Sequence, residues 1–196
     1  MNRPEAIRAV LDAADRQSPV IATVGHASYD LFAVEDRPAN FYTWGSMGLA
    51  SSIGLGVALA RPGLAVYVID GDGSVLMNLG SLATIGWSRP ANLVEVILDN
   101  QQYATTGGQR SATSGGVDLR AAAAALRIDR HADVDTQAGL HAALARTREE
   151  PGPWVIVAHI TETAADQRQP ADCVFTKQRF MAAIGVPESA TRGGPA

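Results

Sequence analysis

Short apolar runs alternate along the chain with longer stretches in which apolar positions recur at helical spacing. The short runs are typical of buried strands, and they lie at residues 20–24, 64–69, 93–98 and 154–160. The longer stretches indicate helices at residues 4–16, 46–60, 78–87, 118–126, 136–148 and 175–184. Because the strands are apolar on both faces, the sheet needs cover on both sides. The pattern therefore predicts an α/β fold, a three-layer sandwich in which helices flank both faces of a mostly parallel sheet.

The length of the chain fits a single domain. No internal repeat or linker interrupts the alternation, so we predict one domain over residues 1–186. The last stretch, residues 187–196, is rich in glycine, proline and small polar residues, and we expect it to form a flexible tail.

Composition excludes several classes of function. Hydrophobic residues make up 46% of the chain and charged residues 18%, which favours a packed core over disorder. The net charge of −4, without a basic block, argues against a nucleic-acid or anionic-membrane partner. The single cysteine, Cys173, excludes a disulfide framework and a cysteine-ligated zinc or iron–sulfur site. No stretch is long and apolar enough to span a membrane or to act as a secretory signal, so we predict a cytoplasmic location.

Candidate chemistry lies at the ends of two neighbouring strands. Asp72 stands between Gly71 and Gly73 just after the strand at residues 64–69, and Asn100 follows the next strand 28 residues later. A strand–helix–strand unit of this length brings the two strand ends side by side, so both side chains can reach one ion. Oxygen ligands with few charges suit Mg²⁺ held together with phosphates, and the N–H groups of Gly73 and Ser74 can face an anion. The alternative is that these are two unrelated polar turns.

The same residues resemble the signature of enzymes that depend on thiamine diphosphate, in which Gly-Asp-Gly is followed by Asn after a little under thirty residues. The resemblance implies the three-layer fold of that family and two cofactors, thiamine diphosphate and Mg²⁺. It further implies that the Asp72 carboxylate, the Asn100 side chain and the main-chain oxygen of Gln102 are the Mg²⁺ ligands. Gly71, Gly73 and Ser74 would then bind the diphosphate.

A second resemblance lies upstream, at Trp44-Gly45-Ser46-Met47-Gly48. This stretch is similar to the segment that receives the aminopyrimidine ring in thiamine-dependent decarboxylases. The resemblance implies that Gly45 accepts a hydrogen bond from the 4′-amino group through its carbonyl and that Ser46 belongs to the same contact. It also implies that Met47 supports the bent shape of the cofactor. The alternative for Met47 is a core methionine at the start of a helix.

The turn after the first strand supplies a further set of candidates, Gly25, His26 and Ser28. In the family this loop lies near the diphosphate, which makes these residues candidate contacts. A loop histidine without a ligand is the alternative for His26.

The loop from Asp99 to Gln109 resembles that of phosphonopyruvate and sulfopyruvate decarboxylases, with an Asn-x-x-Tyr step followed by Thr-Thr-Gly-Gly-Gln. It implies that Tyr103 contacts the cofactor. One departure concerns residues 28–31, which read Ser-Tyr-Asp-Leu where these decarboxylases often have a segment like Ser-Arg-Glu-Leu. Phosphonates and sulfonates favour guanidinium partners, so the identity of the 2-oxo acid stays open.

The activating carboxylate of thiamine enzymes is missing from this pattern. The family uses a Glu from a separate pyrimidine-binding domain, and none of the glutamates here stands in a resembling context: Glu5, Glu35, Glu95, Glu149, Glu150, Glu162 and Glu188. The resemblance therefore implies the diphosphate-binding half of a two-subunit 2-oxo acid decarboxylase, without a catalytic residue of its own. The partner would be a pyrimidine-binding subunit in a heterotetramer, which we expect to meet the rim around Met47 and residues 103–108.

Three other functions remain open or disfavoured. The same architecture could serve a carboligase, if the enamine meets an acceptor carbonyl, or a non-catalytic cofactor-binding or regulatory subunit. A dinucleotide-binding domain is disfavoured, because no Gly-x-Gly-x-x-Gly opens a helix after the first strand.

Overall fold

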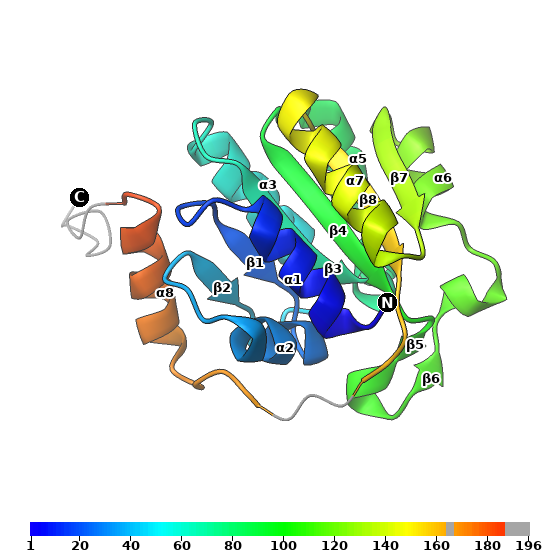
Figure 1. Cartoon of the computed structure of the whole chain (residues 1–196), viewed down its shortest axis with the longest axis horizontal. Coiled ribbons are helices and arrows are strands. Elements are labelled where there is room, and N and C mark those ends of the chain that lie inside the picture. Colours follow the sequence, from blue (N-terminus) through cyan, green and yellow to red (C-terminus); the bar gives the residue numbers. More distant parts are fainter. Residues whose placement is uncertain (164–166, 187–196) are drawn as a thin grey trace.

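The computed structural model describes residues 1–163 and 167–186. Its centre is a six-stranded sheet in the order β2-β1-β3-β4-β8-β7, and every neighbouring pair is parallel (Figure 1). The strands are β1 Val20–Ala22, β2 Asn40–Tyr42, β3 Val66–Gly71, β4 Leu93–Asp99, β7 Arg130–Val134 and β8 Trp154–His159. A separate antiparallel pair joins β5 Gln102–Tyr103 to β6 Gln109–Arg110 beyond the end of β4.

Helices cover both faces of the sheet. One face packs against α1 Arg3–Ala13, α2 His26–Val34 and α7 Gln137–Glu149. The other packs against α3 Ala50–Ala60, α4 Asp72–Met77, α5 Gly80–Ser88, α6 Leu119–Ala125 and α8 Cys173–Ala183. In Figure 1, α1 and α7 cross in front of the sheet and α3 lies behind it. The three-layer α/β sandwich predicted from the sequence is confirmed.

Alternation along the strands builds two separate cores. Tyr67 and Ile69 belong to the core under α1, α2 and α7, whereas Val66 and Val68, on the same strand β3, belong to the core under the other helices. Successive side chains of a strand point to opposite faces, so one continuous apolar run serves both layers. This is why the central strands could be recognised from the sequence.

Several local elements differ from the prediction. The edge strands β2 and β7 were missed, because β2 has three residues and β7 is only partly buried, so neither forms an apolar run. The helix predicted over residues 78–87 is preceded by a separate helix, α4, which starts at Asp72 directly after β3. The predicted loop at residues 25–28 is likewise mostly helix, since α2 begins at His26. Glycine disfavours helix intrinsically, but burial of the first turn of α4 outweighs that preference here.

The helix predicted over residues 46–60 begins only at Ala50. Gly45, Ser46 and Gly48 have positive φ angles of +84°, +57° and +86°, which keep this segment out of a helical path. A positive φ is uncommon for serine, and the carbonyl of Ser46 accepts from the N–H of Leu49 at 3.1 Å, which closes a turn before α3.

In the part of the chain that the structure describes, no helix is long and apolar enough to cross a membrane. The cytoplasmic location stays a prediction. The predicted tail, residues 187–196, lies outside the described residues.

Candidate functional site

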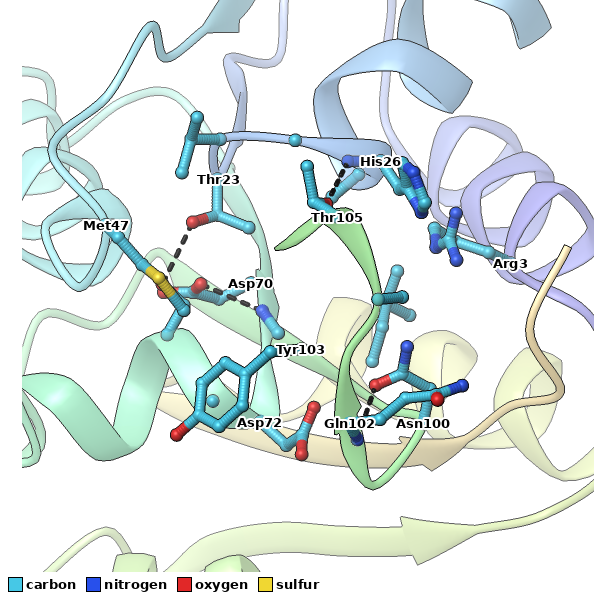
Figure 2. Close-up of a pocket in the computed structure, with 18 of the residues that line it drawn as sticks. Arg3, Thr23, His26, Met47, Asp70, Asp72, Asn100, Gln102, Tyr103 and Thr105 are labelled. Atoms are coloured by element: carbon cyan, nitrogen blue, oxygen red, sulfur yellow. Dashed lines mark hydrogen bonds between the residues drawn. The ribbon is translucent and has the colours of Figure 1, made fainter. Parts of the chain in front are cut away.

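A cavity lies at the carboxyl ends of β1, β3 and β4, with a volume of about 740 Å³ when its open mouth is counted (Figure 2). It lies at the neighbouring strands β1 and β3, where the strand order changes direction: the strand that follows β1 is added on one side of this pair, as β2, and the strand that follows β3 is added on the other, as β4. Ligands of open α/β sheets bind at such a switch point. The cavity lining includes ten of the predicted residues: Gly25, His26, Met47, Gly71, Asp72, Gly73, Ser74, Asn100, Gln102 and Tyr103.

Asp72 is held at the floor of the cavity by hydroxyl groups. It is 2% exposed, and its Oδ2 accepts hydrogen bonds from the hydroxyl of Ser111 and, at 3.0 Å, from that of Thr113. Both donors flank the start of the 3₁₀ helix η2, Ala112–Gly115. Burial raises the pKa of Asp72, and the negative charge of Asp99 adds to the increase, while the Ser111 and Thr113 hydroxyls lower it. A bound cation would stabilise the ionised carboxylate and so lower the pKa of Asp72.

Asn100 and Gln102 lie beyond β4, around a tight turn. Gln101 has a positive φ of +62°, and this bend lets the N–H of Gln102 donate to Oδ1 of Asn100 at 3.2 Å. Asp99 accepts from the N–H of Gln101 at 3.0 Å, so side chains hold the turn on both sides. Figure 2 shows Asn100 and Gln102 on the same side of the cavity as Asp72.

These residues fit a magnesium ion. Among residues 1–163 and 167–186, no three His, Cys, Asp or Glu side chains are grouped so that they could hold a metal by themselves. The available donors are one buried carboxylate, one amide oxygen and a main-chain carbonyl, and this set suits a hard cation that also takes phosphate oxygens. Asp72 would supply the only formal charge, so the ion would depend on the phosphates for the rest. The donor chemistry therefore agrees with the Mg²⁺–diphosphate arrangement that the sequence predicts.

Ser74 connects three segments around the cavity. Its hydroxyl lies 2.9 Å from that of Thr23 at the end of β1 and accepts from the N–H of Gly48 at 3.0 Å. The segment that carries Met47 is thereby fixed to the start of α4. Met47 projects from this segment toward Asp70 and Tyr103 (Figure 2).

Two glycines are required by close approaches at the cavity wall. A Cβ on Gly73 would lie 2.2 Å from the ring of Tyr103, so the ring can pack there only against a glycine. Gly25 has a φ of +88°, and a Cβ there would lie 2.4 Å from the hydroxyl of Thr105. Thr105 also accepts from the N–H of His26 at 3.3 Å, which joins the start of α2 to the loop after β5.

Three predicted contacts lie outside the lining of the cavity. Gly45 and Ser46 are exposed, next to Met47, and their contacts with a ligand stay predictions. Ser28 is fully buried, and its hydroxyl donates to the main-chain oxygen of Thr23 at 2.7 Å. Its hydroxyl thus faces the end of β1 and not the cavity, and the diphosphate contact of Ser28 stays a prediction.

Arg3 and Glu162 belong to the site but carried no signal in the sequence. Arg3, the first residue of α1, is 3% exposed and lines the cavity, where it forms ion pairs with Asp30, at 2.8 Å, and with Glu162. Glu162 also contacts Nδ1 of His26 at 3.0 Å and Nδ2 of Asn100 at 2.5 Å. Burial raises the pKa of Glu162, but the hydrogen bonds from Arg3 and Asn100 outweigh it and hold that pKa below its usual value.

Comparisons with known proteins identify the family of the chain. Residues 23–158 match the family model described as "Thiamine pyrophosphate enzyme, C-terminal TPP binding domain", where thiamine pyrophosphate is another name for thiamine diphosphate. Phosphonopyruvate decarboxylase from Streptomyces viridochromogenes is 39% identical over 191 residues, which are 96% of this chain and 48% of that protein. Sulfopyruvate decarboxylase subunit beta from Methanocaldococcus jannaschii is 45% identical over 127 residues, which are 65% of this chain and 67% of that subunit.

A solved structure is similar in fold. The X-ray structure of a protein from Mycobacterium smegmatis, assigned as a thiamin diphosphate-dependent enzyme, superposes with a TM-score of 0.72 at 23% identity. The match covers 83% of this chain and 32% of that one. The chain thus spans about half the length of the phosphonopyruvate decarboxylase and a third of the solved chain.

Proposed function

The chain belongs to the thiamine pyrophosphate enzymes, and we propose that it is the diphosphate- and magnesium-binding subunit of a two-subunit 2-oxo acid decarboxylase. It is a C-terminal TPP-binding domain, homologous to sulfopyruvate decarboxylase subunit beta and to phosphonopyruvate decarboxylase. The observation that carries the proposal is the cavity in which Met47, Asp72, Asn100 and Gln102 come together from three separate segments.

Each residue has a distinct part in this proposal. Asp72, Asn100 and the carbonyl of Gln102 would hold Mg²⁺, which would supply positive charge for binding the diphosphate. The main-chain N–H groups of Gly73 and Ser74, at the start of α4, would face the diphosphate oxygens. Met47, which lines the cavity, would support the cofactor, and thiamine diphosphate would supply the electron sink for the loss of CO₂.

The carboxylate that activates the cofactor is expected from a partner subunit. Of the glutamates in the described residues, Glu95 is fully buried within the sheet and Glu162 is held by Arg3, His26 and Asn100. Glu5 caps the first turn of α1, and Glu35 pairs with Arg8 on an exposed surface. Glu149 and Glu150 lie at the end of α7. None of these six glutamates lines the cavity, which supports a site completed by another chain.

The proposal is tested by binding and by turnover separately. The purified chain should bind thiamine diphosphate in a titration that requires Mg²⁺, yet should not decarboxylate sulfopyruvate, phosphonopyruvate or pyruvate. Activity should appear when it is co-purified with a pyrimidine-binding subunit from the same genome, in an assembly with two copies of each chain. Robust turnover by this chain alone would contradict the proposal, as would magnesium-independent binding.

Asp72→Asn gives the matched variant for the binding experiment. Asparagine keeps the size of the side chain and its ability to accept from Ser111 and Thr113, but it removes the charge. We expect the fold to persist and the magnesium-dependent affinity to be lost. Unchanged affinity in Asp72→Asn would rule out Asp72 as the metal ligand.

A further inference from the structure

Glu162 lies beside the predicted metal ligand Asn100, although the two residues are far apart in the sequence. The register of β4 and β8 pairs Asp99 with His159, and the N–H of Ile160 donates to the main-chain oxygen of Asp99 at 2.9 Å. The two strands therefore end together, and the chain beyond each end carries one of the two side chains. Nδ2 of Asn100 donates to Oε2 of Glu162 at 2.5 Å.

The carboxylate of Glu162 is fixed from two further directions. Its Oε1 accepts from the guanidinium of Arg3 and lies 3.0 Å from Nδ1 of His26. Arg3 is itself anchored by Asp30, at 2.8 Å, and its side chain is 4% exposed. Glu162 therefore joins the start of α1, the start of α2 and the end of β4 at the edge of the cavity, in an orientation that three donors determine.

This arrangement selects one of the two orientations of the Asn100 amide. The oxygen and nitrogen ends of an amide are nearly equal in size, but only the oxygen can ligate a cation. Donation from Nδ2 to Glu162 and acceptance by Oδ1 from the N–H of Gln102 specify the same orientation. A carboxylate that accepts from the nitrogen also increases the electron density on the oxygen, as partners of metal ligands commonly do.

We propose that Glu162 is a positioning residue of the metal site: it holds the Asn100 amide with its oxygen available to Mg²⁺ and fixes Nδ1 of His26 as the protonated ring nitrogen. The inference rests on the proposed function, since it needs Asn100 to be a ligand. It differs from a purely structural role, in which Glu162 would only tie α1 to the sheet through Arg3.

The experiment separates the positioning role of Glu162 from a purely structural one by replacing the Asn100 amide with a carboxylate, whose two ends are both oxygen. Thiamine diphosphate is titrated by calorimetry, at a series of Mg²⁺ concentrations, into four proteins that each comprise residues 1–196: the parent, Glu162→Ala, Asn100→Asp and the double variant. An aspartate at position 100 presents an oxygen in either orientation, so it does not need Glu162 to be aligned. It would also repel Glu162 at their short separation.

We expect Glu162→Ala to weaken the Mg²⁺ affinity about 10- to 100-fold in the parent background. In the Asn100→Asp background, the same change should leave the affinity unchanged or increase it. Equal losses in both backgrounds, or no loss in the parent, would overturn the positioning role. If the parent itself shows no magnesium-dependent binding, the proposed function fails, and the role of Glu162 fails with it.

Two controls accompany these proteins. Glu35→Ala removes a carboxylate that pairs with Arg8 at 3.0 Å on an exposed surface, and it should leave Mg²⁺ affinity unchanged. If Glu162→Ala does not fold, Glu162→Gln replaces it in both backgrounds, because glutamine keeps the size and one acceptor oxygen. Its effect on affinity should be smaller and should still differ between the two backgrounds.

Discussion

Glu95 gives a sharp prediction about pH, because it is a fully buried carboxyl group in a parallel sheet. Oγ of Ser51 lies 2.6 Å from Oε1 of Glu95 and 3.3 Å from Oδ2 of Asp70. One hydroxyl proton cannot serve two carboxylates. Asp70 also accepts from the N–H of Gly71 at 2.8 Å, and whenever Ser51 donates to Asp70 a protonated Glu95 can donate to Ser51 in turn.

The magnitude follows from the pKa of Glu95. Burial, and secondly the charge of Asp70, raises this pKa from 4.5 to about 8. Between these two pH values the folded chain holds a proton that the unfolded chain has released, so the free energy of unfolding falls as the pH rises. The slope is about 1.4 kcal/mol per pH unit until the folded pKa is passed. Between pH 6 and pH 9 we therefore expect a loss of roughly 3 kcal/mol from this group.

Glu95→Gln should remove this loss. The amide can donate to Ser51 as the protonated acid does, and it ionises in neither the folded nor the unfolded state. The stability of the variant relative to the parent should therefore increase by roughly 3 kcal/mol between pH 6 and pH 9. Urea unfolding at pH 6, 7, 8 and 9, followed by the fluorescence of the buried Trp154, measures the difference. Glu149→Gln, at an exposed position, is the control and should follow the parent. Parallel pH profiles for the parent and Glu95→Gln would refute the reasoning.

Three further predictions concern the cavity. Asn100→Ala should weaken Mg²⁺-dependent binding of thiamine diphosphate less than Asp72→Ala, because the amide carries no charge. Calorimetry compares the two affinities, and a larger loss in Asn100→Ala would contradict the assigned roles. Met47→Ala should keep cofactor affinity but lower kcat of the assembled enzyme by up to about 100-fold, because the bound cofactor would be held less firmly in its reactive conformation. Steady-state kinetics tests this, and an unchanged kcat would mean that Met47 is only a packing residue. Gly73→Ala should cost roughly 1–3 kcal/mol of stability, since its Cβ would meet the Tyr103 ring at 2.2 Å, and Tyr103→Ala should recover part of that loss in urea unfolding.

The sequence by itself determined the layer architecture and two polar side chains that line the cavity, Asp72 and Asn100. A buried parallel strand is apolar on both faces, so β3 and β4 stand out as continuous runs without knowledge of their neighbours. The side chains that follow such strands must emerge at one edge of the sheet, which brings Asp72 and Asn100 together through a single strand–helix–strand unit. Both facts depend on residues close in sequence.

The tertiary structure alone decided which other side chains surround Asp72 and Asn100. Ser28 looked available in a loop, but α2 begins at His26 and turns the Ser28 hydroxyl toward the main chain of β1. Arg3 and Glu162 meet across 159 positions because α1 packs over the sheet and β8 lies next to β4. No local pattern encodes such a meeting. Hydrophobic periodicity specifies which face of an element is buried, whereas the order of the strands decides whose polar ends share a cavity.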